Sequence, residues 1–172
     1  MTIEELFKDK AVKAKEKTEI ISKWILDGSL PTDELISFAE KGKDPVKGTC
    51  IEALEYATKQ KPDMADETIL TFVTSTLPEK APRIKWESAK VIGNIAHQFP
   101  DQLEKPIQGL LANTDDEGTV VRWSAAFALG EILKMKTKHN ATLLPAIESI
   151  CEKEEKNSIK KIYLDAIKKT AK

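Results

Sequence analysis

Two dipeptides carry the most distinctive chemistry of this sequence: Lys85-Trp86 and, 37 residues later, Arg122-Trp123. Tryptophan and arginine that become buried together are common anchors of protein interfaces, because they combine a large apolar surface with a charged group. Indole rings beside cations also suit the stacking of nucleic-acid bases. Both dipeptides therefore indicate recognition of a partner molecule.

Residues that could catalyse a reaction or hold a metal are few. The seven glycines are scattered and form no phosphate-binding loop, and His97 and His139 lie apart without a serine or cysteine arranged for catalysis. Cys50 and Cys151 form no CxxC pair, so we expect two buried free thiols and no zinc site. The sequence thus predicts a protein without catalytic residues, cofactor or metal.

The composition narrows the class of partner and the compartment. Lys plus Arg number 27 and Asp plus Glu 28, which gives a net charge of −1 and none of the basic excess usual in nucleic-acid-binding proteins. Apolar runs are too short to span a bilayer, and the N-terminal segment contains no signal-peptide core. We therefore expect a cytoplasmic protein with no membrane partner.

Four segments of the chain superpose without a gap, and two of them position the tryptophans. They begin at Val46, Ile84, Val121 and Ile159, at spacings of 38, 37 and 38 residues. Each has a cation at its second position, Leu or Ile at its ninth, and mostly apolar residues at the intervals of a helix with one buried stripe. A fixed period of this length is typical of helical repeat arrays.

Shorter amphipathic segments precede these repeats, at residues 33–41, 66–77, 103–112 and 142–154, and strand signals are almost missing. We therefore predict an all-α fold, an α-α superhelix of about four helical pairs over residues 31–172, each pair an outer helix followed by an inner one. Residues 1–30 do not follow the repeat register. They are predicted as an N-terminal cap of two helices, at 2–13 and 16–27, with Gly28 ending the second. Cap and array form one domain.

The inner segments resemble HEAT repeats. Asp44-Pro45-Val46-Lys47 matches the start of that pattern, and the segment from Val121 to Gly130 matches most of it through Val121-Arg122, Ala125-Ala126 and Ala128-Leu129-Gly130. The resemblance implies a solenoid whose inner helices line a concave surface. It is specific to the fold rather than to one function, since such arrays serve as scaffolds, receptors, regulators and DNA-binding proteins.

The same resemblance raises a question about the second-position cations. In that family they pair with an aspartate at the helix start, but here only Asp44 is present, and other residues replace it in the remaining repeats: Pro82, Thr119 and Asn157. A cation at a helix N-terminus is also disfavoured by the helix dipole. The four cations therefore need either a neighbouring carboxylate or an acidic ligand: Lys47, Lys85, Arg122 and Lys160.

The repeat register also predicts which side chains face away from the core. With position 1 set at Ile84 or Val121, positions 3, 7, 10 and 14 are opposite the apolar stripe. In the two central repeats these are Trp86, Lys90, Gly93 and His97, then Trp123, Phe127, Gly130 and Lys134. We expect the tryptophans to form a ridge and the glycines a shallow floor. The alternative is that the tryptophans pack sideways between neighbouring helices.

Two functions from different classes remain open. The leading hypothesis is a non-enzymatic scaffold that binds a protein or peptide, preferably acidic, through Trp86, Trp123, Phe127, Lys85, Lys90, Arg122, Lys134 and His97. The alternative is a nucleic-acid-binding protein similar to the DNA alkylation-repair glycosylases built from HEAT-like repeats. That resemblance is partial, because Lys90 and Phe127 stand where a carboxylate is wanted and an Asn-x-Trp-Asp segment is absent.

Overall fold

The structure of the protein is a computed structural model that describes residues 1–171. Within these residues the chain is helical and contains no β-strand. Its ten α-helices are α1 (Ile3–Lys8), α2 (Ala14–Leu26), α3 (Thr32–Lys41), α4 (Asp44–Gln60), α5 (Glu67–Thr76), α6 (Pro82–Ile95), α7 (Glu104–Ala112), α8 (Thr119–Lys134), α9 (Asn140–Lys153) and α10 (Asn157–Thr170). Two short 3-10 helices, η1 (Pro62–Met64) and η2 (Ala96–Gln98), follow α4 and α6.

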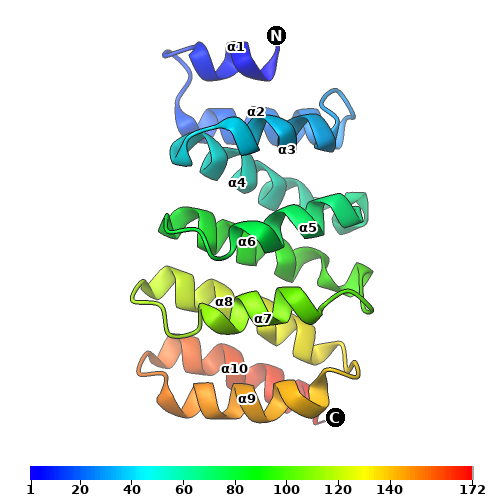
Figure 1. The fold of residues 1–172 in the computed structure, drawn as a ribbon, viewed down its shortest axis with the longest axis vertical. Coiled ribbons are helices and arrows are strands. Elements are labelled where there is room, and N and C mark those ends of the chain that lie inside the picture. Colours follow the sequence, from blue (N-terminus) through cyan, green and yellow to red (C-terminus); the bar gives the residue numbers. More distant parts are fainter. Residues whose placement is uncertain (172) are drawn as a thin grey trace.

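The helices stack as pairs along one axis, with the two ends of the chain at opposite ends of the stack (Figure 1). The inner helices α2, α4, α6, α8 and α10 form a row in which each packs mainly against the next. The outer helices α3, α5, α7 and α9 form a second layer. This arrangement confirms the predicted all-α superhelix of four pairs. At its N-terminal end α1 and α2 add one more pair, with α2 packed along α4 in the inner row.

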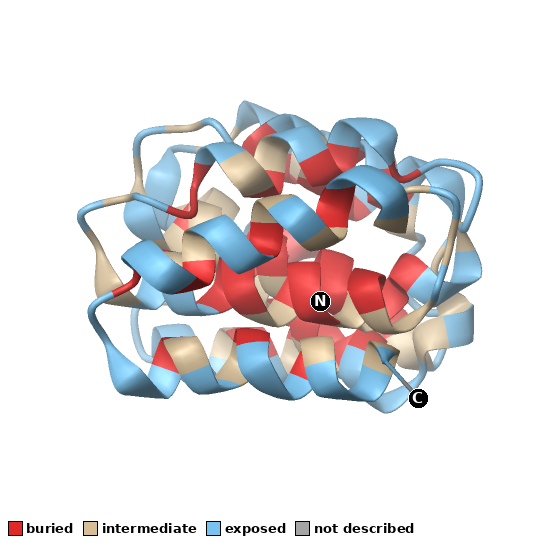
Figure 2. Cartoon of the chain, turned by 90° about the horizontal axis from the view of Figure 1, so that it is seen from below, coloured by how far each residue is buried: buried red, intermediate tan, exposed pale blue. Residues whose placement is uncertain are grey.

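The core lies between the two layers, where Figure 2 shows buried residues along the facing sides of the helices. It contains the predicted stripe of each inner helix, including Leu54, Ile92 and Leu129, which are fully buried. Cys50 and Cys151 are buried free thiols, as expected, and burial raises the pKa of Cys50 to about 12, so this thiol stays protonated. No helix among residues 1–171 is long and apolar enough to cross a membrane.

The first helix is shorter than predicted. It ends at Lys8 rather than near residue 13, because the Asp9 carboxylate accepts a hydrogen bond from the backbone N–H of Ala11 (2.9 Å) and holds the chain in a turn. Short polar side chains compete with helix formation in this way. Gly28 follows the C-terminal end of α2, as expected. Its φ of +82° is one that glycine adopts without a steric penalty.

Candidate binding face of the inner helices

The candidate site is the inner face, defined as the solvent-facing side of α4, α6 and α8. The predicted residues of the central repeats lie on α6, α8 and the adjoining η2, and their exposed fractions differ. Trp123 is 38% exposed and His97 is exposed, whereas four others are half-buried: Trp86, Lys90, Phe127 and Lys134. Val120, one turn before Trp123, is 49% exposed. It precedes position 1 of its repeat, so the repeat register did not predict it.

The aromatic pair that forms on this face is Trp123 with Phe127. Their rings stack in parallel, with centroids 5.9 Å apart and an interplanar angle of 11°. Trp123 therefore stacks on a residue of its own helix, and the ridge of Trp86 beside Trp123 stays a prediction. Val120, Trp123 and Phe127, at spacings of three and four residues, share one side of α8, and we call these three residues the apolar strip.

Gly93 and Gly130 each line a shallow hollow on this face, but they also pack against neighbouring helices. Both are buried. A Cβ atom at Gly93 would overlap the ring of Phe127, lying 2.8 Å from its Cδ2 atom, and one at Gly130 would lie 3.3 Å from the Cβ atom of Ala166. These glycines therefore let neighbouring inner helices approach closely, and Gly93 holds the ring of Phe127 in place beneath Trp123.

This packing predicts that the effect of Gly93→Ala on stability changes sign when Phe127 is removed. Gly93→Ala should destabilise the wild-type protein by about 1 kcal/mol, because the displaced Phe127 ring leaves its stack and outweighs the better helix propensity of alanine. In a Phe127→Ala background the same change should stabilise the protein by roughly 0.5–1 kcal/mol, since only the propensity gain remains. Urea unfolding of the four proteins measures both values, and equal effects in both backgrounds would contradict the contact.

The second-position cations pair with carboxylates in the loops that follow. The Lys47 Nζ atom lies 3.2 Å from Glu79, the Lys85 Nζ atom 3.1 Å from Asp116, and Arg122 Nε 3.1 Å from Glu154. We call these three pairs the ion-pair ladder. Each acid lies five residues before the next repeat begins, at positions 79, 116 and 154. This spacing was a signal in the sequence that an alignment centred on Asp44 missed.

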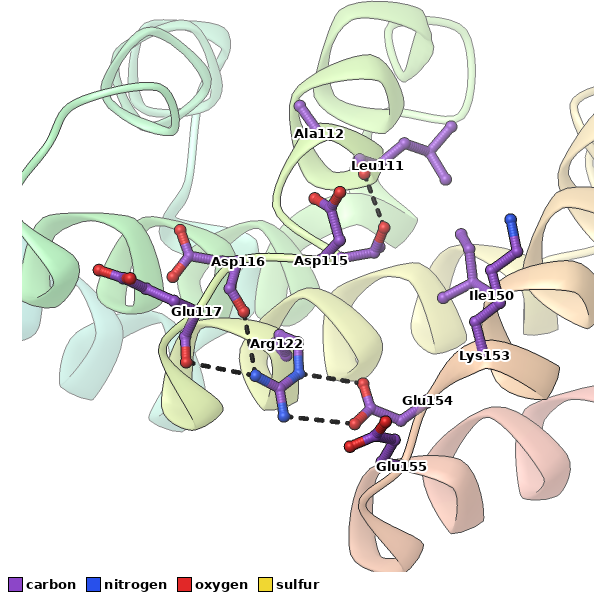
Figure 3. A pocket seen from close by; sticks show the side chains of 11 residues that line it. Leu111, Ala112, Asp115, Asp116, Glu117, Arg122, Ile150, Lys153, Glu154 and Glu155 are labelled. Atoms are coloured by element: carbon purple, nitrogen blue, oxygen red, sulfur yellow. Dashed lines mark hydrogen bonds and ion pairs between the residues drawn. The ribbon is translucent and has the colours of Figure 1, made fainter.

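The ladder changes the role of two predicted partner-binding residues. The carboxylate of Glu154, with a side chain only 3% exposed, accepts from two nitrogens of Arg122, which also donates to the backbone carbonyls of Asp116 and Glu117 (Figure 3). Lys85 donates one hydrogen bond to the carboxylate of Asp116, at 3.1 Å. Burial raises the pKa of Asp116, but bonds from the Gly118 N–H and Lys85 outweigh it, so the pKa is lowered. Lys85 and Arg122 thus connect neighbouring repeats through these ion pairs.

A cavity of about 630 Å³ adjoins the last pair of the ladder, between the α7–α8 loop and the α9–α10 loop. Leu111 and Ile150 form its apolar part, and Arg122 with the loop carboxylates forms its polar part (Figure 3). The cavity contains no histidine, serine or cysteine that could act as a nucleophile or base. Among residues 1–171, this cavity included, no group of three or more His, Cys, Asp or Glu is placed to hold a metal ion.

The remaining predicted cations are also paired. Lys134 lies 2.8 Å from Glu131, and Lys90 lies 3.2 Å from Glu87 and 3.8 Å from Glu55. Together with Glu52, which pairs with Arg83 at 3.1 Å, Glu55 and Glu87 form what we call the acidic cluster. It lies on α4 and α6, and the repeat register does not predict it, because its members come together only when two neighbouring repeats stack. All four cations predicted for the inner face thus have carboxylate partners.

Glu87 is the most buried member of the acidic cluster. The residue is only 2% exposed, its Oε1 atom accepts from Lys90, and its Oε2 atom has no hydrogen-bond partner. Burial raises the pKa of Glu87 to about 7, against the opposing effect of Lys90 and with some help from Glu52 and Glu55. Such a carboxyl is partly protonated near neutral pH.

Two shallow hollows flank the apolar strip. One, of about 200 Å³, is lined by Gly93, His97, Glu131, Lys134 and Met135. The other, of about 180 Å³, lies between α8 and α10 and contains Phe127, Lys134 and Ile162. The structure therefore brings His97 and Lys134 together at one end of the strip, and it gives the strip two adjacent recesses for side chains.

The fold is shared with several solved structures. A designed armadillo repeat protein in complex with a (KR)4 peptide matches with a TM-score of 0.72 at 20% identity, covering 89% of this chain and 69% of that one. A computationally designed armadillo repeat protein for modular peptide recognition matches with a TM-score of 0.73 at 18% identity, covering 90% and 74%. The complex of CpcE and CpcF of phycocyanin lyase from Nostoc sp. PCC7120 matches with a TM-score of 0.70 at 16% identity, covering 95% and 94%.

These likenesses confirm the predicted armadillo- or HEAT-like helical repeat fold. At such low identity they establish the fold alone. No protein-family model and no curated protein sequence matches the chain.

Proposed function

We propose that this protein is a non-enzymatic scaffold whose inner face binds an extended peptide segment of a partner protein. The observation that carries the proposal is the apolar strip. Val120 and Trp123 are two of the few large apolar side chains exposed among the described residues, at 49% and 38%, and they lie side by side with Phe127 on a rigid helix. An aromatic side chain held in place before binding loses little entropy when a partner covers it.

Two further observations support a peptide as the ligand. The hollows beside the strip, of about 200 and 180 Å³, are of a size for single side chains rather than a small molecule buried whole. Among the solved structures of the same fold, the designed armadillo proteins are described as binding peptides. In the proposed complex, apolar side chains of the segment contact Trp123 and Phe127, and Trp86, His97 and Lys134 border them.

The ion pairs count against nucleic acid and against an acidic partner. Nucleic-acid affinity comes largely from cations that are free to replace counterions at phosphates. Lys85, Lys90, Arg122 and Lys134 all have carboxylate partners in the structure. A DNA duplex would have to compete with those carboxylates. We therefore expect weak DNA binding, without the steep dependence on salt concentration of a dedicated phosphate-binding surface.

The proposal predicts a large effect of Trp123→Ala on binding. Peptides are first selected on the wild-type protein from a phage-displayed library of random 12-residue sequences, and their affinities are then measured by fluorescence anisotropy. Trp123→Ala should weaken the selected peptides at least tenfold, because a central aromatic anchor contributes 2 kcal/mol or more, roughly, to such interfaces. The variant should lose only about 1 kcal/mol of stability with its ring stack.

Leu164→Ala provides the matched control. Leu164 lies on the last inner helix, α10, and is 55% exposed. The corresponding residues of the earlier repeats are buried: Ile51, Ala89 and Ala126. Leu164 is thus a comparable exposed apolar side chain away from the apolar strip. Binding should be unchanged. Failure to enrich any peptide, or equal affinity of the selected peptides for the wild type and Trp123→Ala, would refute the proposed function.

A further inference from the structure

We infer that the acidic cluster is a subsite for an arginine side chain of the bound segment, and that Lys90 occupies this subsite in the free protein. The inference rests on the proposed function, because the same segment would contact the apolar strip. It reverses the acidic partner expected from the sequence.

The cluster has more carboxylates than cations. Glu52 and Glu55 come from α4 and Glu87 from α6, the neighbouring inner helix. Arg83 pairs with Glu52, and the single ammonium group of Lys90 serves both Glu55 and Glu87. Three carboxyl groups thus share two cations. Because Glu87 is partly protonated near neutral pH, part of one negative charge is left without a matching cation.

The Oε2 atom of Glu87 indicates where a donor is missing. It is buried and accepts no hydrogen bond, although Oε1 of the same carboxylate accepts one from the Lys90 ammonium group at 3.2 Å. A buried carboxylate oxygen without a donor is unusual in folded proteins, and each such atom calls for an explanation. In the ionised form of Glu87 this donor is missing, and in our proposal it arrives with the partner and holds Glu87 ionised.

Lys90 is suited to leave. Its side chain is 30% exposed, whereas those of Glu55 and Glu87 are 6% and 2% exposed, so Lys90 lies on the solvent side of the cluster. Burial lowers the pKa of Lys90, but Glu87 and Glu55 outweigh it and the pKa is raised in the cluster. In water the ammonium group is also charged at neutral pH, so leaving the cluster needs no proton transfer. A long, hydrated ammonium group has many rotamers available there.

Arginine fits the vacated position better than lysine does. A guanidinium group presents five N–H donors in a planar fork and bonds both oxygens of a carboxylate at once, whereas an ammonium group acts as a single point charge. It would supply the donor that Glu87 Oε2 lacks and still reach Glu55. Tyr56 beside the cluster has its pKa raised by burial and then by Glu52, Glu55 and Glu19, so the negative potential extends to α2 and attracts a cation from solution.

The distance between the subsite and the apolar strip sets the spacing in the partner. Neighbouring packed helices lie roughly 8–10 Å apart, so the cluster on α4 and α6 and the strip on α8 are separated by about one to two such steps. An extended chain advances about 3.3 Å per residue. The arginine should therefore stand roughly three to six residues from the apolar or aromatic side chain that contacts Trp123.

The test uses the phage-displayed library of random 12-residue peptides and two protein variants. The enriched peptides should carry an arginine at the stated spacing from an apolar residue. Lys90→Met should bind them about tenfold more tightly, because it empties the subsite, and Glu52→Gln with Glu55→Gln should bind them at least tenfold more weakly. Outer-helix controls, Lys105→Met on α7 and Glu148→Gln on α9, should change nothing.

A second arm needs no protein variant and so does not depend on folding. Replacing the arginine of an enriched peptide by citrulline, which keeps the shape and removes the charge, should weaken binding to the wild type tenfold or more. Enrichment of acidic or uncharged peptides, unchanged binding of the citrulline peptide, or weaker binding by a folded Lys90→Met variant would overturn the inference. If such peptides still lose affinity with Trp123→Ala, the scaffold function stands and only the subsite is wrong. If neither Trp123→Ala nor the citrulline replacement weakens binding, both the proposed function and the arginine subsite are refuted.

Discussion

Replacing Glu154 with alanine is expected to lower the free energy of unfolding by about 3 kcal/mol, the low end of the cost of breaking a buried ion pair. The Glu154 side chain is 3% exposed and that of its partner Arg122 is 20% exposed. The substitution leaves the guanidinium of Arg122 largely out of water without a counterion, and it removes the acceptor for the backbone N–H of Lys156. Urea denaturation followed by circular dichroism measures the change.

The neighbouring Glu155 offers a matched control, because it is exposed and outside the ion-pair ladder. Glu155→Ala should change the stability by less than about 0.5 kcal/mol. A loss below 1 kcal/mol for Glu154→Ala would contradict a structural role of the ladder. Arg122 would then be available to a partner, and the reading of Arg122 as a ligand-binding residue would regain its basis.

The second large effect is a dependence of stability on pH that originates at Glu87. Its pKa is raised from 4.5 to about 7 in the folded state, first by burial. Between pH 4.5 and 7 the folded protein therefore holds a proton that the unfolded chain has released. Stability must fall as the pH rises through this window, by roughly 3 kcal/mol in total for a shift of this size.

Glu87→Gln isolates this contribution, because glutamine keeps the shape of the protonated acid and does not titrate. Near pH 4.5 the variant should match the wild type, and above pH 7 it should be more stable, with the difference growing across the window. The groups that face Glu87 are Glu52 and Glu55 of α4 and Lys90 of its own helix, and they remain in both proteins. A variant less stable than the wild type at pH 8 would show that Lys90 holds the carboxylate ionised instead.

The fold was predictable because the apolar stripe of each inner helix is a local property. The stripe repeats every 37 or 38 residues, and its period identifies both the helices and their buried side. Breakers and caps then located the outer helices within a residue or two. The end of α1 was not predictable in this way, because the Asp9 side chain forms a competing turn that no periodicity reports.

The site was harder to predict, because it depends on how neighbouring helices are staggered. Phe127 covers Gly93 and Lys90 reaches Glu55, and in both contacts position 7 of one inner helix meets position 10 of the preceding one. The sequence reasoning placed equal positions of neighbouring helices side by side and so predicted neither contact. A period measured within each helix carries no information about this stagger.

The electrostatic character of the inner face was missed for a related reason. Cations were counted at Lys85, Lys90 and Arg122, but their partners lie about 31 to 35 residues away in the chain, except for Glu87. Only the folded stack brings the partners together. Two signals become visible when all four repeats are compared position by position. A carboxylate stands five residues before each of the last three repeats, and Glu55 replaces the position-10 glycine in the first.

The most direct test of the binding face is the response of the indole N–H signals to a selected peptide. The three tryptophans, Trp24, Trp86 and Trp123, lie on α2, α6 and α8, and single Trp→Phe variants assign their signals in a ¹H–¹⁵N correlation spectrum. Titration with a library-selected peptide should shift the Trp123 signal most and the Trp86 signal next, because binding covers the apolar strip. A peptide that saturates the protein while the Trp123 signal stays in place would show that the partner binds elsewhere.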